Sequence, residues 1–137
     1  MQRALRLVAG VPILLGILGM GALGGGRDAA APQEDVRARL VDVDGAQVEV
    51  THLSVGGDTT LEGELGRGRL RVPFSRIERI ELASESKDRD RMRATVTLRE
   101  GAPVTLVLRS STTFYGQLAS GAYQVRARDL RSVEIGR

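Results

Sequence analysis

The chain contains no cysteine and no tryptophan among its 137 residues, and its one histidine is His52. Without cysteine, the protein has no disulfide, no thiolate nucleophile, no cysteine-based metal site and no lipoprotein attachment. Aromatic residues are also scarce, since two phenylalanines and two tyrosines make up 3% of the chain. The core of the folded part must therefore be built from Leu, Val and Ile.

Lysine is nearly absent, because Lys87 is the single lysine and the other basic residues are arginines. The 20 basic residues exceed the 17 acidic ones, but residues 1–32 hold three of the basic and one of the acidic residues. The remainder therefore has 17 basic and 16 acidic residues. Affinity for a polyanion depends on many phosphate contacts. A nearly neutral remainder has no charge excess for them, so we expect no nucleic-acid partner.

The N-terminal region differs from the rest of the chain. Arg3 and Arg6 precede an apolar run over residues 7–23, which is followed by the small-residue segment GGGRDAAAPQ. A basic start, an apolar middle and a small-residue exit are typical of a secretory signal. The run is shorter than the roughly 20 apolar residues that span a bilayer, and it contains Pro12.

We predict that residues 1–24 form a hydrophobic leader helix, which acts as a cleaved signal peptide or as a retained N-terminal anchor. Residues 25–35, rich in Gly, Ala and Pro, are predicted to be a linker. The protein is then expected to be exported, periplasmic or extracellular. It would touch the inner membrane through residues 7–23 alone, and only if the leader is retained.

After the linker, apolar and polar residues alternate. In the segment VRARL, residues 36–40, the apolar side chains occupy every second position. This pattern is typical of a strand buried on one face. Further alternating segments follow, separated by glycine-containing turns such as Asp44-Gly45. A short fifth strand ends at Leu82, so the sequence predicts five strands within residues 36–83.

The sequence of the folded part contains an internal repeat. Residues 61–82 align with residues 114–135 without a gap at an offset of 53, and Gly63 then aligns with Gly116. The earlier strands align at an offset of 56, so the second copy lacks three residues in one turn. Loops tolerate such changes in length. The prediction is a β repeat at 36–83, a polar connector at 84–91 and a second β repeat at 92–137.

Each copy ends with apolar residues spaced by three, three and two. They are Phe74, Ile77, Ile80 and Leu82 in the first copy and Ala127, Leu130, Val133 and Ile135 in the second. Spacing of three suits one turn of 3₁₀ helix, and spacing of two suits a strand.

A strand, a 3₁₀ turn and a strand, with a glycine in a bent inner strand, resembles the SH3-like and Sm-like small β-barrels. The chain is also similar to uncharacterised exported bacterial proteins with this type of ending. The resemblance is one of fold and implies no activity. It implies an all-β protein with two tandem five-stranded small-barrel-like repeats packed into one unit.

The first candidates for chemistry favour structural roles. His52 aligns with Leu108 and shares a phase with Val50, so we expect a packing position. A metal site would also need a second histidine or a cysteine. The pair Asp42 and Asp44, followed by Gly45, lacks the further ligands of a calcium loop and predicts a hairpin turn.

The remaining candidates lead to the same conclusion. Glu62 and Glu64 flank an inward glycine, and the second copy has Tyr and Gln at their positions, which favours a solvated strand face. The hydroxyl-rich segment 110–113 has no nearby histidine and does not match a nucleophile elbow. We therefore predict no enzymatic activity, no cofactor and no metal, and a hydrolase is the least favoured alternative.

Arginines form the best candidate for a binding surface. The Arg-bearing face consists of Arg67, Arg69, Arg71, Arg76, Arg79, Arg126, Arg128 and Arg131. Guanidinium groups bind carboxylates and phosphates through paired hydrogen bonds. Charged residues also protect strand edges from aggregation, and the glutamates nearby in sequence can neutralise these arginines.

The hypothesis from sequence is a non-catalytic extracytoplasmic binding or scaffolding module of the bacterial cell envelope. It would act through edge strands or the Arg-bearing face on a protein or an envelope polymer, and a homo-oligomer fits the small-barrel resemblance. The alternative is an Sm-like nucleic-acid-binding protein. The leader and the nearly neutral folded part argue against that alternative.

Overall fold

The computed structural model describes residues 35–85 and 87–136. The predicted leader and residues 25–34 of the predicted linker lie outside these ranges. The described part of the chain folds into strands joined by short turns, with 3₁₀ turns as its helices. This confirms the all-β class. No helix among the described residues is long and apolar enough to cross a membrane.

The strands follow one another in two similar series. The first series is β1 (Ala38–Asp42), β2 (Gln47–Val55), β3 (Thr60–Leu65), β4 (Gly68–Pro73), the 3₁₀ helix η1 (Phe74–Arg76) and β5 (Ile77–Ser84). The second is β6 (Arg91–Leu98), β7 (Val104–Arg109), β8 (Thr113–Leu118), β9 (Gly121–Arg126), the 3₁₀ helix η2 (Ala127–Asp129) and β10 (Leu130–Ile135). Both 3₁₀ turns occur where the apolar spacing predicts them.

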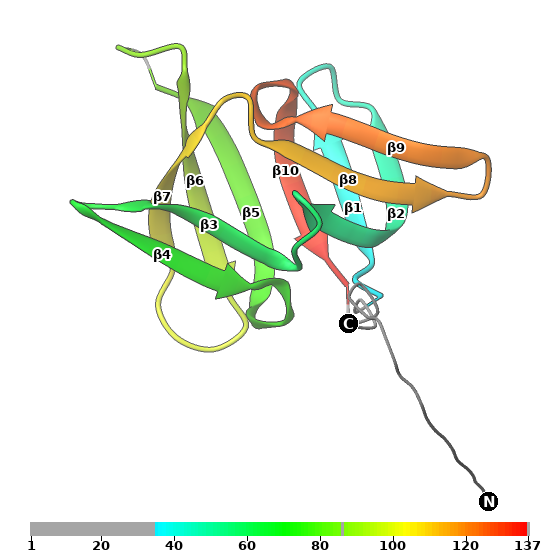
Figure 1. Cartoon of the computed structure of the whole chain (residues 1–137), viewed down its shortest axis with the longest axis horizontal. Helices are drawn as coiled ribbons and strands as arrows, with labels where there is room; N and C mark the ends of the chain where they lie inside the picture. The colour runs from blue at the N-terminus through cyan, green and yellow to red at the C-terminus, as the bar shows by residue number, and fades with distance from the viewer. Residues whose placement is uncertain (1–34, 86, 137) are drawn as a thin grey trace, which may run out of the picture. The chain divides into compact units, whose positions relative to one another are not determined.

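All ten strands belong to one antiparallel sheet in the order β4-β3-β7-β6-β5-β10-β1-β2-β8-β9. The β3–β4 hairpin pairs with β7, and the β8–β9 hairpin pairs with β2. Neither hairpin therefore pairs with the strand that precedes it in the chain. Figure 1 shows each hairpin crossing in front of the other strands, so the sheet curls over at both ends.

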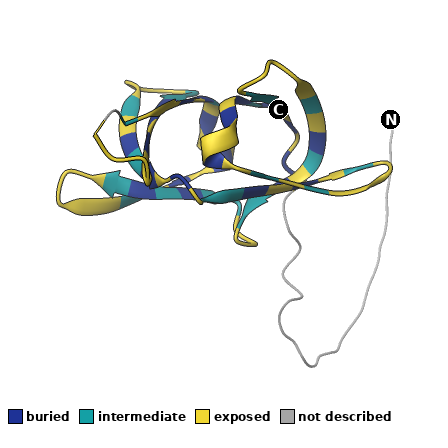
Figure 2. Ribbon diagram, turned by 90° about the horizontal axis from the view of Figure 1, so that it is seen from above, coloured by how far each residue is buried: buried dark blue, intermediate teal, exposed yellow. Residues whose placement is uncertain are grey.

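The core lies inside the two curled ends of the sheet, where the β3–β4 and β8–β9 hairpins cross the other strands. Figure 2 shows buried residues, in dark blue, alternating with exposed residues, in yellow, along several strands, as expected for strands that are buried on one face. Its largest fully buried side chains are Phe74, Phe114, Leu40, Leu53, Leu61, Ile77, Ile80, Leu106, Leu130, Val96 and Val133. Burial of each aliphatic side chain stabilises the fold by about 1.5–3 kcal/mol. In a chain without disulfides, this core provides the main stabilisation. It is mostly aliphatic, as the composition predicts, but it also contains both phenylalanines.

The middle of the sheet is the pairing of β5 with β10. Ile80 lies directly opposite Val133, and both side chains are fully buried. Both side chains are β-branched, and such side chains pack well on the buried face of a pleated sheet. The two halves of the sheet therefore share one continuous hydrogen-bonded ladder and one core.

Two glycines let the hairpins cross close to their neighbours. A Cβ atom added to Gly116 would lie 2.6 Å from the Cβ of Val50, and one added to Gly63 would lie 2.9 Å from the Cβ of Leu106. These distances are shorter than van der Waals contact. Glycine is thus required where β8 crosses β2 and where β3 crosses β7, as the bent inner strands of the sequence prediction suggest.

We expect Gly116→Ala to lower the free energy of unfolding by about 1–3 kcal/mol, because the new methyl group overpacks a contact with the backbone-fixed Cβ of Val50. Urea denaturation measures this change. The matched control is Gly68→Ala, whose new Cβ would meet its nearest neighbour at 3.8 Å. Equal stability of the two variants would contradict the close crossing.

Candidate functional site

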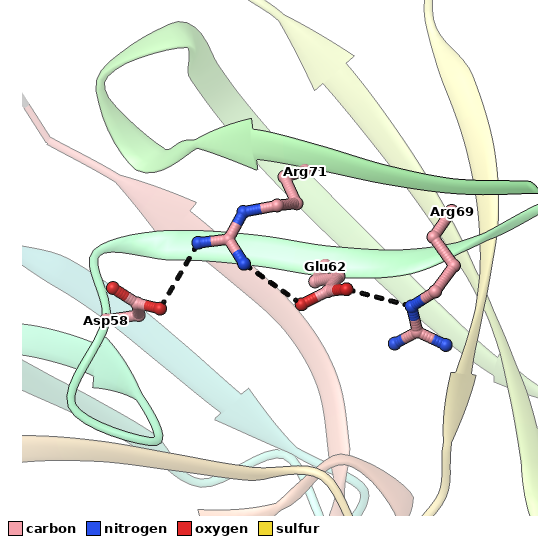
Figure 3. A network of polar contacts seen from close by, with 4 residues as sticks. All are labelled: Asp58, Glu62, Arg69 and Arg71. Carbon is pink, nitrogen blue, oxygen red and sulfur yellow. Dashed lines mark hydrogen bonds and ion pairs between the residues drawn. The ribbon is translucent and has the colours of Figure 1, made fainter.

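Two arginines of the predicted Arg-bearing face bind nearby carboxylates of the same chain. Arg69 Nε donates to Glu62 Oε2 at 2.8 Å, and Arg71 Nη1 donates to Glu62 Oε1 at 3.3 Å. Arg71 Nη2 also donates to Asp58 Oδ2 at 3.3 Å. Figure 3 shows the four side chains as one continuous network over β3 and β4.

The network changes the electrostatics of Glu62. The hydrogen bond from Arg69 is the main reason that the pKa of Glu62 lies below its ordinary value, and the positive charges of Arg69 and Arg71 lower this pKa further. The same hydrogen bond raises the pKa of Arg69. Both arginines are therefore neutralised locally, and they are poorly suited to recruit an external anion.

A second row of charges crosses the outer face of the sheet. Arg39 on β1 lies opposite Glu49 on β2 and opposite Glu134 on β10, and Glu134 lies opposite Arg79 on β5. The N–O distances are 3.5 Å for Arg39–Glu49, 3.6 Å for Arg39–Glu134 and 3.0 Å for Arg79–Glu134. Opposite charges on facing strands stabilise a sheet modestly, by roughly 0.2–1 kcal/mol per pair.

This row of charges lines a depression in the surface. The depression has a volume of about 430 Å³, is open to solvent and lies over β10, β1 and β2. Arg39, Glu49 and Glu134 line it, and their charges already compensate one another. A shallow hollow with paired charges does not provide the convergent polar groups of a small-molecule site.

The other predicted arginines are spread over several elements. Arg131 Nη2 donates to the carbonyl oxygen of Val43 at 3.0 Å. Among the described residues, no hydrogen bond or ion pair of the side chain is found for Arg67, Arg76, Arg126 or Arg128. They belong to the β3–β4 turn, η1, the end of β9 and η2, respectively. The structure therefore brings Arg69 and Arg71 together and distributes the remaining arginines.

His52 does not pack in the core, and the expectation from its alignment with Leu108 is wrong. The pairing of β2 with β8 is irregular between Thr51 and Ser54, and His52 has a φ of 54°. This β-bulge adds a residue, so Leu53 becomes fully buried and the His52 side chain is 52% exposed. The His52 N–H donates to Asp35 Oδ1 at 3.2 Å.

The predicted hairpin turn after β1 is confirmed. Asp42 Oδ1 accepts hydrogen bonds from the N–H groups of Asp44 and Ala46, each at 2.9 Å, and Gly45 has a positive φ of 92°. Glu64 faces solvent, as predicted, and binds Arg91 at 2.6 Å. Within residues 35–85 and 87–136, no three His, Asp or Glu side chains lie close enough together to hold a metal ion.

The sheet has two free edges, β4 and β9, because these strands end the strand order. The N–H of Phe74 donates to Thr59 O, and the N–H of Ala127 donates to Thr112 O, which continues each hairpin ladder by one step. Hydrogen-bonded and non-hydrogen-bonded pairs alternate in antiparallel strands. The outward-facing backbone groups are therefore those of Arg69, Arg71 and Pro73 on β4 and of Ala122, Gln124 and Arg126 on β9.

The two edges differ in their protection. Pro73 has no N–H, and the charged Arg69 and Arg71 precede it on β4, so this edge carries two of the features that block further pairing. The corresponding positions of β9 are Ala122, Gln124 and Arg126, and each presents both an N–H and a C=O. Pro73 indicates from the sequence alone that its strand lies at an edge or ends there, because proline has no N–H, and β4 is indeed an edge strand. No comparable sequence signal identifies β9 as the other edge.

Comparison with known proteins gives one finding. A family model described as "Uncharacterised protein" matches residues 32–137, which is more than half of the chain. The chain belongs to this family. No curated protein and no solved structure matches the chain. The matched residues begin within the predicted linker and include every described strand.

We expect Arg69→Gln to raise the pKa of Glu62 towards the ordinary value of 4.5, because the strongest stabilisation of its carboxylate is removed. In the native chain this pKa is lowered, so the ion pair is intact above pH 4.5 and is lost as the pH falls through the lower, folded-state pKa. Carbon-detected NMR titration measures the shift. Arg67→Gln is the control, and an equal midpoint in both variants would contradict the network.

We expect His52→Gly to retain or slightly increase stability, because glycine adopts a positive φ without steric cost. His52→Val should lower the thermal midpoint, because a β-branched residue is strained at this φ. Both side chains are uncharged, so the comparison isolates the backbone. If valine were as stable as glycine, the bulge geometry would be refuted.

Proposed function

We propose that the protein is a non-catalytic binding or scaffolding module of the bacterial cell envelope, located outside the cytoplasm and acting through the free edge of β9. One observation carries this proposal. β9 offers three residues whose outward N–H and C=O groups pair with no other strand of residues 35–85 and 87–136, whereas Pro73 removes one N–H from the equivalent edge of β4. An exposed edge strand is a ready template for pairing with another chain.

The charge distribution supports a role for an edge strand over a role for the Arg-bearing face. Arg69, Arg71 and Arg79 bind carboxylates of the same chain. The folded part has 17 basic and 16 acidic residues after residue 32, so little net charge is left to attract a polyanion. Backbone hydrogen bonding needs no such excess. The partner is then a protein segment that adds a strand.

We also infer that the sheet arose from two related five-stranded units of the SH3-like or Sm-like type. If each strand is exchanged with the strand five places away in the chain (β1 with β6, β2 with β7 and so on), the strand order reads the same in the opposite direction. The sheet therefore has approximate two-fold symmetry. The central pair, Ile80 and Val133, is related by the offset of 53. The two 3₁₀ turns make equivalent hydrogen bonds, from Phe74 to Thr59 and from Ala127 to Thr112.

In this interpretation the two units have exchanged hairpins. Each half of the sheet contains strands from both copies. For example, β3 and β4 of the first copy complete the half that contains β6 and β7 of the second copy. Such an exchange makes each unit incomplete without the other. A unit of about 47 residues is small for independent stability, so the exchange gives a physical reason for retaining both copies.

The proposed location predicts that the protein accumulates in the envelope fraction. Cell fractionation with protease accessibility measures this, since a protease added outside the inner membrane should digest the protein. Leu15→Arg, which places a charge in the apolar leader, should retain the chain in the cytoplasm. A cytoplasmic, uncleaved wild-type protein would refute the proposal and favour the alternative of an Sm-like nucleic-acid-binding protein.

A further inference from the structure

We propose that the partner of β9 is β9 of a second copy of the chain, in an antiparallel register centred on Gln124. This inference rests on the proposed function, because it assigns an occupant to the same edge. The two sheets would join into one continuous sheet about a two-fold axis. Figure 1 shows β9 at the rim of the sheet, with β8 on one side and no further strand on the other.

The backbone of β9 fits this register. With Gln124 opposite Gln124 of the second copy, Ala122 lies opposite Arg126, and Arg126 lies opposite Ala122. All three residues direct their N–H and C=O groups outward, as the hairpin ladder requires. Each such antiparallel pair exchanges two hydrogen bonds, so the register provides about six.

The side chains on the outer face are self-complementary in the same register. Gln124 amides can donate to and accept from one another across the axis. Arg126 faces Ala122 of the other copy, so no like charges lie directly opposite, a juxtaposition that destabilises facing strands. Ala122, Gln124 and Arg126 are all exposed, so they are free to form these contacts.

The inner face adds an apolar contact. Tyr123 and Val125 alternate with the outward residues and are half-buried against the core. In the register centred on Gln124, each Tyr123 lies opposite Val125 of the other copy. Pairs of an aromatic and a β-branched residue are among the favourable cross-strand pairs. The pairing would therefore extend the apolar side of the sheet across the axis.

The edge of β4 provides an internal comparison, because its residues occupy equivalent positions. A register centred on Arg71 would place two arginines opposite each other and Arg69 opposite Pro73. It would oppose like charges and lose the N–H of Pro73. Arg71 is also bound to Glu62 and Asp58. Self-pairing is thus favoured at β9 and disfavoured at β4.

The size of the contact sets the expected affinity. Six residues of β9 give an interface below the roughly 1,200 Å² at which stable complexes begin. We therefore expect a reversible dimer with a Kd of about 1 µM or weaker. A covalent trap detects such a dimer more reliably than chromatography does.

The absence of cysteine makes disulfide trapping specific. Cα atoms of a hydrogen-bonded antiparallel pair are about 5.5 Å apart, within the range for a disulfide. We expect the full chain carrying Gln124→Cys to form a disulfide-linked dimer under mild oxidation at least tenfold faster than the chain carrying Arg71→Cys. Association through a shared micelle or through residues 1–34 would cross-link both variants alike.

The register is tested by mixing two variants. Ala122→Cys and Arg126→Cys should form a mixed disulfide with each other and should not link efficiently to themselves. A mixed disulfide that forms no faster than the self-linked species would overturn the register centred on Gln124.

A blocked edge provides the second control. The double variant Gln124→Cys with Arg126→Pro should lose the cross-link, because proline removes one outward N–H. The change suits the local backbone, since Arg126 has φ −86° and ψ 152°, close to the −61° and 141° of Pro73. Circular dichroism and urea denaturation of the proline variant establish that it remains folded.

The outcomes separate this inference from the proposed function. Equal cross-linking rates at positions 124 and 71, or a folded proline variant that still cross-links, would overturn self-pairing. If the envelope location holds while position 124 never cross-links between copies, the occupant is another extended segment and the binding module remains. A cytoplasmic location would refute the proposed function whatever the cross-linking result.

Discussion

The fold depends on two close strand crossings. The β3–β4 and β8–β9 hairpins cover the core, but each is joined to the rest of the sheet by a short seam. The seam between β3 and β7 has one paired position, Glu64 with Val107, and the seam between β2 and β8 has three. Gly63 and Gly116 bring the backbones together at these seams, so that burial of Leu106 and Val50 compensates for the short ladders.

This arrangement determines which charges are available at the surface. Cross-strand register places Arg39 between Glu49 and Glu134 and places Arg71 opposite Glu62. Curling the sheet leaves these pairs on the outside, where they compensate one another. Around these pairs the outer surface is close to neutral over short distances, which is why the proposed recognition uses the directional backbone groups at the sheet edges.

Alternation of apolar residues predicted the strands of the first copy, because burial of one face follows directly from that pattern, and the alignment of the two copies extended the prediction to ten strands. The 3₁₀ turns were predicted from the apolar spacing of three. These patterns could not predict strand partners, since a face pattern is the same whether β3 pairs with β2 or with β7. The bulge at His52 was missed for a related reason. The extra residue shifts the alternation of buried and exposed positions by one, but no change in residue types marks where this happens. The neutralisation of Arg69 also depends on a diagonal contact with Glu62 that sequence spacing does not specify.

The unequal protection of the two edges has a consequence for assembly. A sheet with two open edges could add copies at both ends and grow without limit, which is the usual hazard of edge strands. Blocking β4 with Pro73 and with paired arginines leaves one open edge per chain. If β9 meets its own equivalent, association stops at two copies, because each partner then has only its blocked edge left. If the two halves derive from one duplicated unit, the differences between residues 69, 71 and 73 and residues 122, 124 and 126 convert a symmetric, polymerising sheet into one that closes as a pair.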